Sequence, residues 1–300
     1  MKSNVIIATA PCSWGVWYAD GTPSGTPSAV FLEQAGQAGY RELELGPDGY
    51  LPADETVLRE ELAKNNLSIA AGTICWPFDQ EADFEAFKDK LAKLCQRVKS
   101  LGGKYIVAMD ESDVGQFSEK KENFSSQVWS EFLEKIRLLG LFAKEEYGLE
   151  VVWHPHIKSM IETEEEIVRL MNYTGLNLCL DTGHHAYANG TPDDKGTSVF
   201  AFMRKYAERI TYLHFKNVDK VVWEKVIREK LDVHAAFGLD IMCDLKDGMI
   251  DFKELKNVLD EIQFNGIGVI EQDMPNATPE IAFAAAKRNL SYLKEVKMID

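Results

Sequence analysis

Residues 176–185 read Leu-Asn-Leu-Cys-Leu-Asp-Thr-Gly-His-His, a short apolar run that ends in side chains able to take part in chemistry. A short apolar run bounded by polar residues is typical of a buried strand. Seven further runs of this kind occur along the chain, and a longer segment with helical spacing follows each of them. The eight runs are residues 5–10, 42–45, 67–74, 105–109, 149–153, 176–180, 210–215 and 266–270.

The helical segments between these runs complete a regular alternation. They are residues 28–38, 54–65, 80–101, 125–147, 163–172, 195–208, 251–262 and 278–296. Strand followed by helix eight times, with no linker, predicts a single α/β domain over residues 1–300 that closes as a (β/α)₈ TIM barrel. An open doubly wound sheet is the structural alternative. No GxGxxG motif follows the first run, which continues instead into Pro-Cys-Ser-Trp-Gly at residues 11–15.

One connection is too long to be a simple turn. Residues 217–250 separate the seventh predicted strand from the seventh main helix, and residues 221–231 within this segment have helical spacing. Long loops at the carboxyl ends of barrel strands carry function and often cover the active site. We therefore expect residues 217–250 to form a lid-like insertion over the mouth of the barrel.

The composition excludes several classes of partner. The 300 residues are 45% hydrophobic and 27% charged, with a net charge of −15, which disfavours nucleic acid and anionic membrane surfaces. A phosphorylated substrate is excluded less strongly, because a local basic pocket can override the net charge. The five cysteines lack a CxxC motif and predict reduced thiols in the cytoplasm. We found no signal peptide or membrane span, and homo-oligomerisation stays open.

Polar side chains collect where the predicted strands end. In a parallel barrel these positions meet at one mouth, which is where barrel enzymes build their active sites. Five of the six histidines fall there. The polar residues at strand ends are Glu42, Glu44, Asp110, Glu111, His154, His156, Asp181, His184, His185, His214, Lys216, Glu271, Gln272 and Asp273.

Four of these residues predict a metal site. His154, Asp181, His214 and Glu271 come from four consecutive strands and offer mixed nitrogen and oxygen ligands. Such ligands suit Mn²⁺ or Co²⁺ first, with Mg²⁺, Fe²⁺ and Zn²⁺ as alternatives. A cation with open positions polarises a carbonyl group. The alternative is that these side chains only cap backbone groups at the strand ends, which explains one histidine more easily than the whole set.

The motifs at these positions resemble a known superfamily. The chain reads Leu-Cys-Leu-Asp-Thr-Gly-His at 178–184, Tyr-Leu-His-Phe-Lys-Asn-Val at 212–218 and Val-Ile-Glu-Gln-Asp at 269–273. Together they resemble the xylose-isomerase-like barrels, which include sugar isomerases, keto-sugar epimerases and endonuclease IV. Ser-Trp-Gly at 13–15, the segment at 38–52 and the double-histidine strand end resemble the inosose (2-keto-myo-inositol) dehydratase branch most.

The resemblance implies that Asp181, His214 and Glu271 bind the metal. The first ligand position, usually glutamate in the epimerases, holds His154, which the dehydratase branch also carries. Whether His154 is a ligand or a base stays open. Ile-Lys-Ser after His156 and Cys-Asp-Leu-Lys at 243–246 depart from the branch, so a substrate other than inosose stays open.

The implied reaction is a dehydration of a keto-cyclitol or keto-sugar through a metal-stabilised enolate. The base is His154, His156 or Glu111, because a group with a pKa near neutral suits proton abstraction. The acid that protonates the leaving hydroxyl is Lys216, His184 or Glu271. Lys216 has an alternative role as an ion-pair partner of the carboxylates.

Two further residues are assigned to the small-molecule substrate. Glu44 either hydrogen-bonds sugar hydroxyls or pairs with Arg41, and Trp14 either lines the sugar ring or packs in the core. With His156, His184 and Lys216 they make up the predicted substrate contacts.

Three other functions compete. An isomerase, an epimerase or a 3-keto-glycoside lyase would use the same metal site. DNA repair requires further histidine ligands and a basic face, whereas this chain has Glu44 and Cys75 on the relevant strands and a charge of −15. A non-catalytic binding subunit would not need the four metal-ligating side chains.

Overall fold

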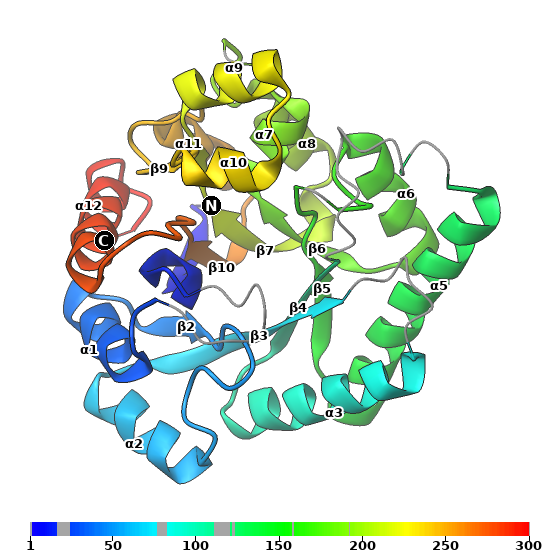
Figure 1. Cartoon of the computed structure of the whole chain (residues 1–300), viewed down its shortest axis with the longest axis vertical. Helices are drawn as coiled ribbons and strands as arrows, with labels where there is room; N and C mark the ends of the chain where they lie inside the picture. Colours follow the sequence, from blue (N-terminus) through cyan, green and yellow to red (C-terminus); the bar gives the residue numbers. More distant parts are fainter. Residues whose placement is uncertain are drawn as a thin grey trace.

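The computed structural model describes residues 2–16, 25–76, 83–110, 121, 124–157, 159–191 and 193–299. Eight parallel strands close into a barrel in the order β1-β10-β7-β6-β5-β4-β3-β2, with helices around it (Figure 1). The predicted TIM barrel is therefore confirmed. The strands are β1 (Asn4–Thr9), β2 (Glu42–Glu44), β3 (Ser68–Trp76), β4 (Tyr105–Asp110), β5 (Glu150–Trp153), β6 (Asn177–Asp181), β7 (Ile210–Phe215) and β10 (Asn265–Ile270).

The helices lie close to the predicted segments. A π-helical turn, Ala143–Tyr147, extends the helix after β4 and ends at Gly148, whose φ of 71° suits glycine. The main helices are α1 (Ser28–Ala38), α2 (Glu55–Lys64), α3 (Phe84–Ser100), α5 (Ser126–Phe142), α6 (Glu164–Thr174), α8 (Thr197–Lys205), α11 (Phe252–Glu261) and α12 (Pro279–Glu295).

A further helix begins directly at the end of β6. Helix α7 (Thr182–Asn189) was not predicted, because its eight residues looked like a strand end with reactive groups. Asp181 starts it, since one carboxylate oxygen accepts a hydrogen bond from the His184 N–H at 2.8 Å. The Asp-Thr-Gly-His motif is thus also a helix start.

Side chains inside the barrel alternate along each strand and form a packed core beneath the mouth. On β7, Tyr212 points inward and lies edge-on to Tyr105 of β4, with 5.1 Å between ring centroids. The strand period of two places His214 and Lys216 on the same side as Tyr212, nearer the carboxyl end. The barrel therefore directs these two polar side chains to its mouth.

Residues 217–250 form a small structured unit. Strand β8 (Asn217–Val218) pairs antiparallel with β9 (Met242–Cys243), and α9 (Lys220–Glu229) and α10 (Val233–Gly238) lie between them. The Asn217 side chain donates to the carbonyls of Leu245 and Ile250, which closes the unit onto the end of β7. None of these residues is among the described residues that line the cavity at the barrel mouth, so their lid role stays a prediction.

None of the helices in the described ranges combines the length and the apolar character that crossing a bilayer requires.

Candidate metal centre and substrate cavity

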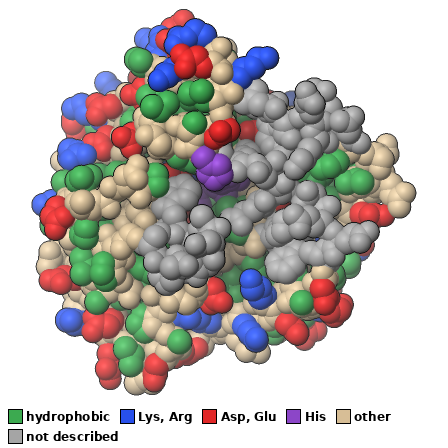
Figure 2. Space-filling model, viewed as in Figure 1, with side chains coloured by type: hydrophobic (Ala, Val, Ile, Leu, Met, Phe, Trp, Pro, Cys, Tyr) green, Lys and Arg blue, Asp and Glu red, His purple; other side chains and the backbone are tan. Residues whose placement is uncertain are grey.

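A cavity of about 640 Å³ opens where the barrel strands end. Figure 2 shows histidine side chains near the middle of this face. Several polar groups that line the cavity come from different strand ends, which is the arrangement expected of a barrel enzyme. We call this set the inner end of the cavity: Glu44, His154, His156, Lys216, Glu271 and Asp273.

Asp181 lies beside the inner end and is 1% exposed. Its Oδ1 is occupied by the start of α7, whereas its buried Oδ2 has no hydrogen-bond partner in the described part of the chain. Oδ2 lies 3.2 Å from Lys216 Nζ and 3.8 Å from His214 Nδ1. The last residue of β6 therefore supports a helix with one oxygen and presents the other to the site.

The residues after Asp181 hold Lys216 in place. The Thr182 hydroxyl donates to the Lys216 carbonyl at 2.7 Å and accepts from the Lys216 N–H at 3.0 Å. Gly183 packs directly on the lysine, because a Cβ there would lie 2.8 Å from Lys216 Cγ. Each residue of the Asp-Thr-Gly motif thus has a structural reason to be where it is.

His214 lies between two carboxylates. Its Nε2 is 2.9 Å from Glu44 Oε1, and its Nδ1 is 3.0 Å from Glu271 Oε2. Glu44 also accepts a hydrogen bond from the Thr73 hydroxyl at 3.2 Å and is 2% exposed. Burial opposes protonation of His214, but Cys179, Glu271 and Glu44 raise its pKa well above the usual value.

The environment of Glu44 differs from the one we expected for a sugar contact. Although it lines the cavity, its described contacts are with His214 and Thr73 rather than with Arg41. A carboxylate on one imidazole nitrogen fixes the ring and its tautomer, and many metal-binding histidines have such a partner on the nitrogen that does not face the metal. Its contact with substrate stays a prediction.

Lys216 is a buried cation among carboxylates. Its Nζ lies 2.8 Å from Asp273 Oδ2, 3.0 Å from Glu271 Oε2 and 3.2 Å from Asp181 Oδ2, and the side chain is almost fully buried. Burial would lower the pKa of Lys216, but these acidic neighbours raise it well above its usual value. The predicted ion pairing of Lys216 with Asp181 and Glu271 is confirmed.

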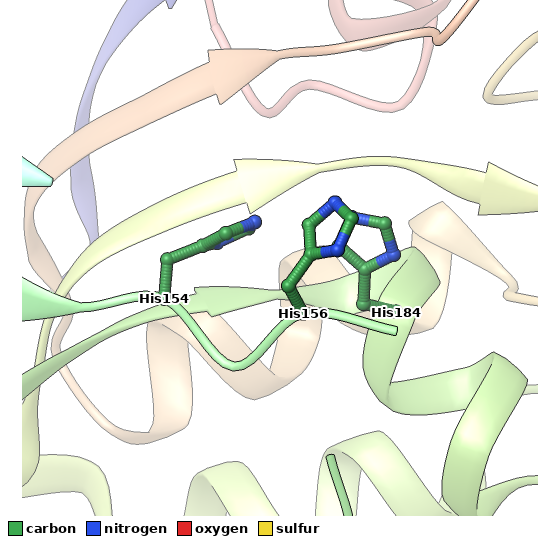
Figure 3. A group of neighbouring side chains, drawn as sticks. All are labelled: His154, His156 and His184. Atoms are coloured by element: carbon green, nitrogen blue, oxygen red, sulfur yellow. The ribbon is translucent and has the colours of Figure 1, made fainter. Parts of the chain in front are cut away.

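Three histidines gather at one side of the inner end (Figure 3). His154 and His156 follow β5 and His184 lies in α7, with ring centroids separated by 4.1 Å for His156 and His184 and 5.3 Å for His154 and His184. The His156 Nδ1–H donates to the Ile157 carbonyl at 2.6 Å, so Nε2 carries the lone pair. Burial lowers the pKa of His156 to about 4 and depresses the pKa of the other two. All three rings are therefore neutral near pH 7.

Within the described residues, four groups of potential ligands bring their donor atoms within 4.8 Å of one another, among them His154, Cys179 and His214, and Glu44, His214 and Glu271. None of these groups contains all four predicted ligands, so the full set stays a prediction.

His214 links the predicted ligands, since its Nδ1 is near both Glu271 and Asp181, and its ring centroid lies 4.6 Å from that of His154. His154 Nδ1 is buried without a hydrogen-bond partner in the described part of the chain. His214 Nδ1 and Asp181 Oδ2 make ion-pair contacts instead, at 3.0 Å from Glu271 Oε2 and 3.2 Å from Lys216 Nζ. A buried polar atom of a native protein rarely lacks a partner, as His154 Nδ1 does, and donor atoms gathered at one place suit an ion.

The charge of the inner end supports the same conclusion. The carboxylates of Asp181, Glu271 and Asp273 surround the ammonium group of Lys216, and Glu44 lies against His214, whose pKa is raised. Four carboxylates thus face two cationic groups. Buried charge of one sign needs compensation. A divalent ion would supply it.

The remaining predicted residues lie in different places. Trp14 is fully buried against Phe31, with 4.9 Å between ring centroids, and its indole N–H donates to Gln34 at 2.8 Å. Trp14 is not among the described cavity-lining residues, so its position fits the alternative that it packs in the core. Glu111, a candidate base, lies outside the described residues.

Two residues at the inner end were not assigned a role from the sequence. Asp273 lies two positions after Glu271 and contacts the same ammonium group, so the period of two in an extended segment was the available signal. Cys12 lines the cavity near Glu271 and Asp273, and burial raises the pKa of its thiol. Nothing in its local sequence separates it from the other cysteines.

Comparisons with known proteins agree with this site. The family described as xylose isomerase-like TIM barrel matches residues 32–296. An inosose dehydratase of Bacillus licheniformis is 30% identical over 298 residues, which is 95% of each chain. Another from Bacillus velezensis is 29% identical over 95% of this chain and 96% of its own.

Solved structures share the fold at lower identity. The IolI protein with a binding zinc atom superimposes with a TM-score of 0.69 at 17% identity, over 98% of this chain and 99% of its own. The probable 3-DHS dehydratase AsbF of Bacillus anthracis gives a TM-score of 0.68 at 18% identity, over 96% and 98%. These two likenesses concern the fold.

Proposed function

Because the chain belongs to the xylose isomerase-like TIM barrel family, we propose that it is a metal-dependent lyase that dehydrates a keto-cyclitol or keto-sugar. The observation that carries the proposal is the convergence of buried His154, Asp181, His214, Lys216 and Glu271 side chains, with carboxylate oxygens of Asp181 and Glu271 within 4 Å of His214 Nδ1. Relatives named inosose dehydratase span almost the whole chain, which favours dehydration over isomerisation.

The metal would be held by His154, Asp181, His214 and Glu271. Mn²⁺ and Co²⁺ suit two imidazoles and two carboxylates, with Zn²⁺, Fe²⁺ and Mg²⁺ as alternatives. When bound, such a cation supplies Lewis-acid stabilisation of the negative charge that develops on a ketone oxygen. Glu44 would keep the His214 ring in the orientation that turns Nδ1 toward the other ligands.

The proton transfers are assigned to the chain's own residues. His156 Nε2 carries a lone pair and the ring lines the cavity, so it accepts the proton from the carbon next to the ketone. Its pKa of about 4 is lower than the near-neutral value expected of the base, which keeps the imidazole free to accept that proton near pH 7. The electron pair of that C–H bond forms the new C=C bond as the C–O bond of the β-hydroxyl breaks. Lys216 Nζ gives its proton to the leaving oxygen, which departs as water, and the enol becomes a diketone.

Two neighbours keep the Lys216 ammonium group in position for this step. His184 Nε2 lies 3.2 Å from Lys216 Nζ, and Asp273 Oδ2 lies 2.8 Å from it. Since the Lys216 pKa is raised, the group stays protonated until a developing oxyanion approaches. Abstraction of the same α-proton without loss of the hydroxyl would instead give an isomerase or epimerase.

The reaction is assumed to take place in the cytoplasm. All five cysteines are free thiols, which is usual for reducing compartments.

The test is a product assay with controlled metal content. The protein is stripped with a chelator and reloaded separately with Mn²⁺, Co²⁺, Zn²⁺ or Mg²⁺. It is then incubated with inosose, keto-hexoses and 3-keto-glycosides in D₂O. We expect one ketone to lose a single water by mass only after metal is restored. Deuterium exchange without water loss would identify an epimerase or isomerase, and absence of both reactions with every metal would overturn the proposal.

A further inference from the structure

The cavity continues past the inner end into a second region that the proposed chemistry does not use. This region lies between helix α3 and the segment that connects β2 to α2. Figure 2 shows Lys and Arg side chains over α3, below the middle of the face that carries the strand ends. We call it the outer chamber and define it by its lining residues, Pro47, Asp48, Leu51, Lys90, Lys93, Leu94 and Arg97.

The outer chamber is basic in an acidic protein. Lys90, Lys93 and Arg97 are spaced at three and four residues along α3, so they share one face of the helix. Asp48 is the one acidic residue among the described residues of the chamber, although the whole chain carries a net charge of −15. The three basic side chains on one wall of the chamber therefore make it locally positive in a protein whose net charge is negative.

Arg97 is held in a fixed position. Its Nη2 donates to the carbonyls of Pro52 at 2.7 Å and Leu51 at 3.3 Å, which ties α3 to the connection after β2. Its buried Nε has no hydrogen-bond partner in the described ranges. Lys93 is exposed, lines the chamber and forms no ion pair with any carboxylate that the structure describes. Positive charge is thus available to a ligand.

We propose that the outer chamber binds an anionic substituent, a carboxylate or a phosphate, carried by the substrate whose keto ring reacts at the inner end. This inference rests on the proposed function and specifies the substrate class within it. A guanidinium group and ammonium groups are the side chains that recognise such anions. The chemical class is therefore an acidic keto-carbohydrate rather than a neutral one.

The opposite charges of the two regions give the substrate one orientation. At the inner end, three carboxylates surround Lys216 and a fourth, Glu44, contacts His214, so an anionic group there would be repelled until a metal is present. The same group is attracted by Lys93 and Arg97 at the other end. The volume also allows a second group, because about 640 Å³ is in the range of pockets for drug-sized ligands and exceeds the need of one six-membered ring.

The experiment compares binding of three probes to the Mn²⁺-loaded protein by calorimetry. The probes are a polyhydroxylated cyclohexanone, its monophosphate and the same ring with a carboxylate substituent. We expect at least one anionic probe to bind about tenfold more tightly than the neutral ring, with an advantage that shrinks as salt is added. Comparing the phosphate with the carboxylate identifies which anion the chamber prefers.

Variants locate the effect in the chamber. Lys93→Glu should weaken binding of the preferred anionic probe about tenfold while changing that of the neutral probe less than about twofold. Lys99→Glu is the matched control, because it makes the same charge change on an exposed position of α3 outside the cavity lining. It should leave all three affinities within about twofold.

Each outcome is decisive. Equal affinity for neutral and anionic probes, or equal effects of the two variants, would overturn the inference. Tight anion binding that depends on Lys93, without any product, would support the chamber and contradict the proposed dehydration. Efficient dehydration of neutral ketones, with no tighter binding of the anionic probes, would support the proposed dehydration and contradict the anion-binding role of the chamber.

Discussion

The two ends of the cavity are built in different ways. At the inner end, Lys216 and Glu271 follow the ends of strands, are buried and contact several charged neighbours each. In the outer chamber, Lys90 and Lys93 project from a helix and are exposed. Reactive groups need fixed positions, which barrel strands provide, whereas helices and loops around the mouth can change without disturbing them. The comparison predicts that substitutions become less damaging from the inner end outward.

Lys216→Met should have the largest effect. It removes the only ammonium group among the described side chains of the inner end and leaves buried carboxylates uncompensated. Loss of one partner from a buried ion pair costs about 3–5 kcal/mol of stability. We expect denaturant titration of the metal-free variant to show a fall of this size, and saturating Mn²⁺ to restore part of it.

A surface lysine provides the control for this variant. Lys220→Met breaks an exposed ion pair with Asp193 that has a similar distance, 2.7 Å, and should leave the unfolding midpoint nearly unchanged. If the two methionine variants unfolded alike, the inner end would not depend on charge compensation.

Asp181→Asn comes next. Asparagine also starts helices well, so α7 should persist while the carboxylate facing Lys216 and His214 is lost. We expect calorimetry to show Mn²⁺ binding weakened by about 100-fold or more, with product formation falling in parallel. Asp251→Asn makes the same change at the start of α11, away from the cavity, and should bind Mn²⁺ normally. Normal binding by Asp181→Asn would remove Asp181 from the metal site.

Glu44→Gln tests a residue that contacts the proposed ligand His214 and is not itself one of the proposed ligands. The amide oxygen can still accept from His214 Nε2, but it polarises the ring less. A change of this kind should weaken Mn²⁺ binding about tenfold, whereas Glu42→Gln on the same strand should not. Unchanged metal affinity together with a raised KM for the ketone would instead support the prediction that Glu44 binds sugar hydroxyls.

The sequence predicted the barrel because alternation of strand and helix is a repeated signal, confirmed by the strand order. It also predicted that Glu44, His154, His156, Lys216 and Glu271 reach one mouth, where they line the cavity, since strand ends of a parallel barrel meet at one mouth. Glu271 Oε2, for example, lies 3.0 Å from both His214 Nδ1 and Lys216 Nζ. Trp14 was wrongly included, and the roles of the others stay predictions. At the inner end, the fold itself determines that residues at strand ends reach the cavity.

The outer chamber could not be predicted in this way. Lys90, Lys93 and Arg97 have the spacing of any solvated helix face, and only tertiary packing against the connection after β2 makes them line a cavity. Helix α7 was not predicted from the sequence for a related reason. Its first residues both start the helix and contribute to the site. The sequence pattern at these residues indicated the site but not the helix that begins there.

Trp14→Phe should have the smallest effect, because Trp14 belongs to neither end of the cavity. The change removes the hydrogen bond to Gln34 but keeps an aromatic ring against Phe31, so we expect a loss of about 1 kcal/mol in the free energy of unfolding. The KM for the ketone should stay within about twofold of the unaltered protein. Gln34→Met, which leaves the indole N–H unpaired, should cost at least as much stability. A several-fold rise in KM for Trp14→Phe with unchanged stability would mean that the indole contacts substrate, and that the boundary between core and cavity lies elsewhere.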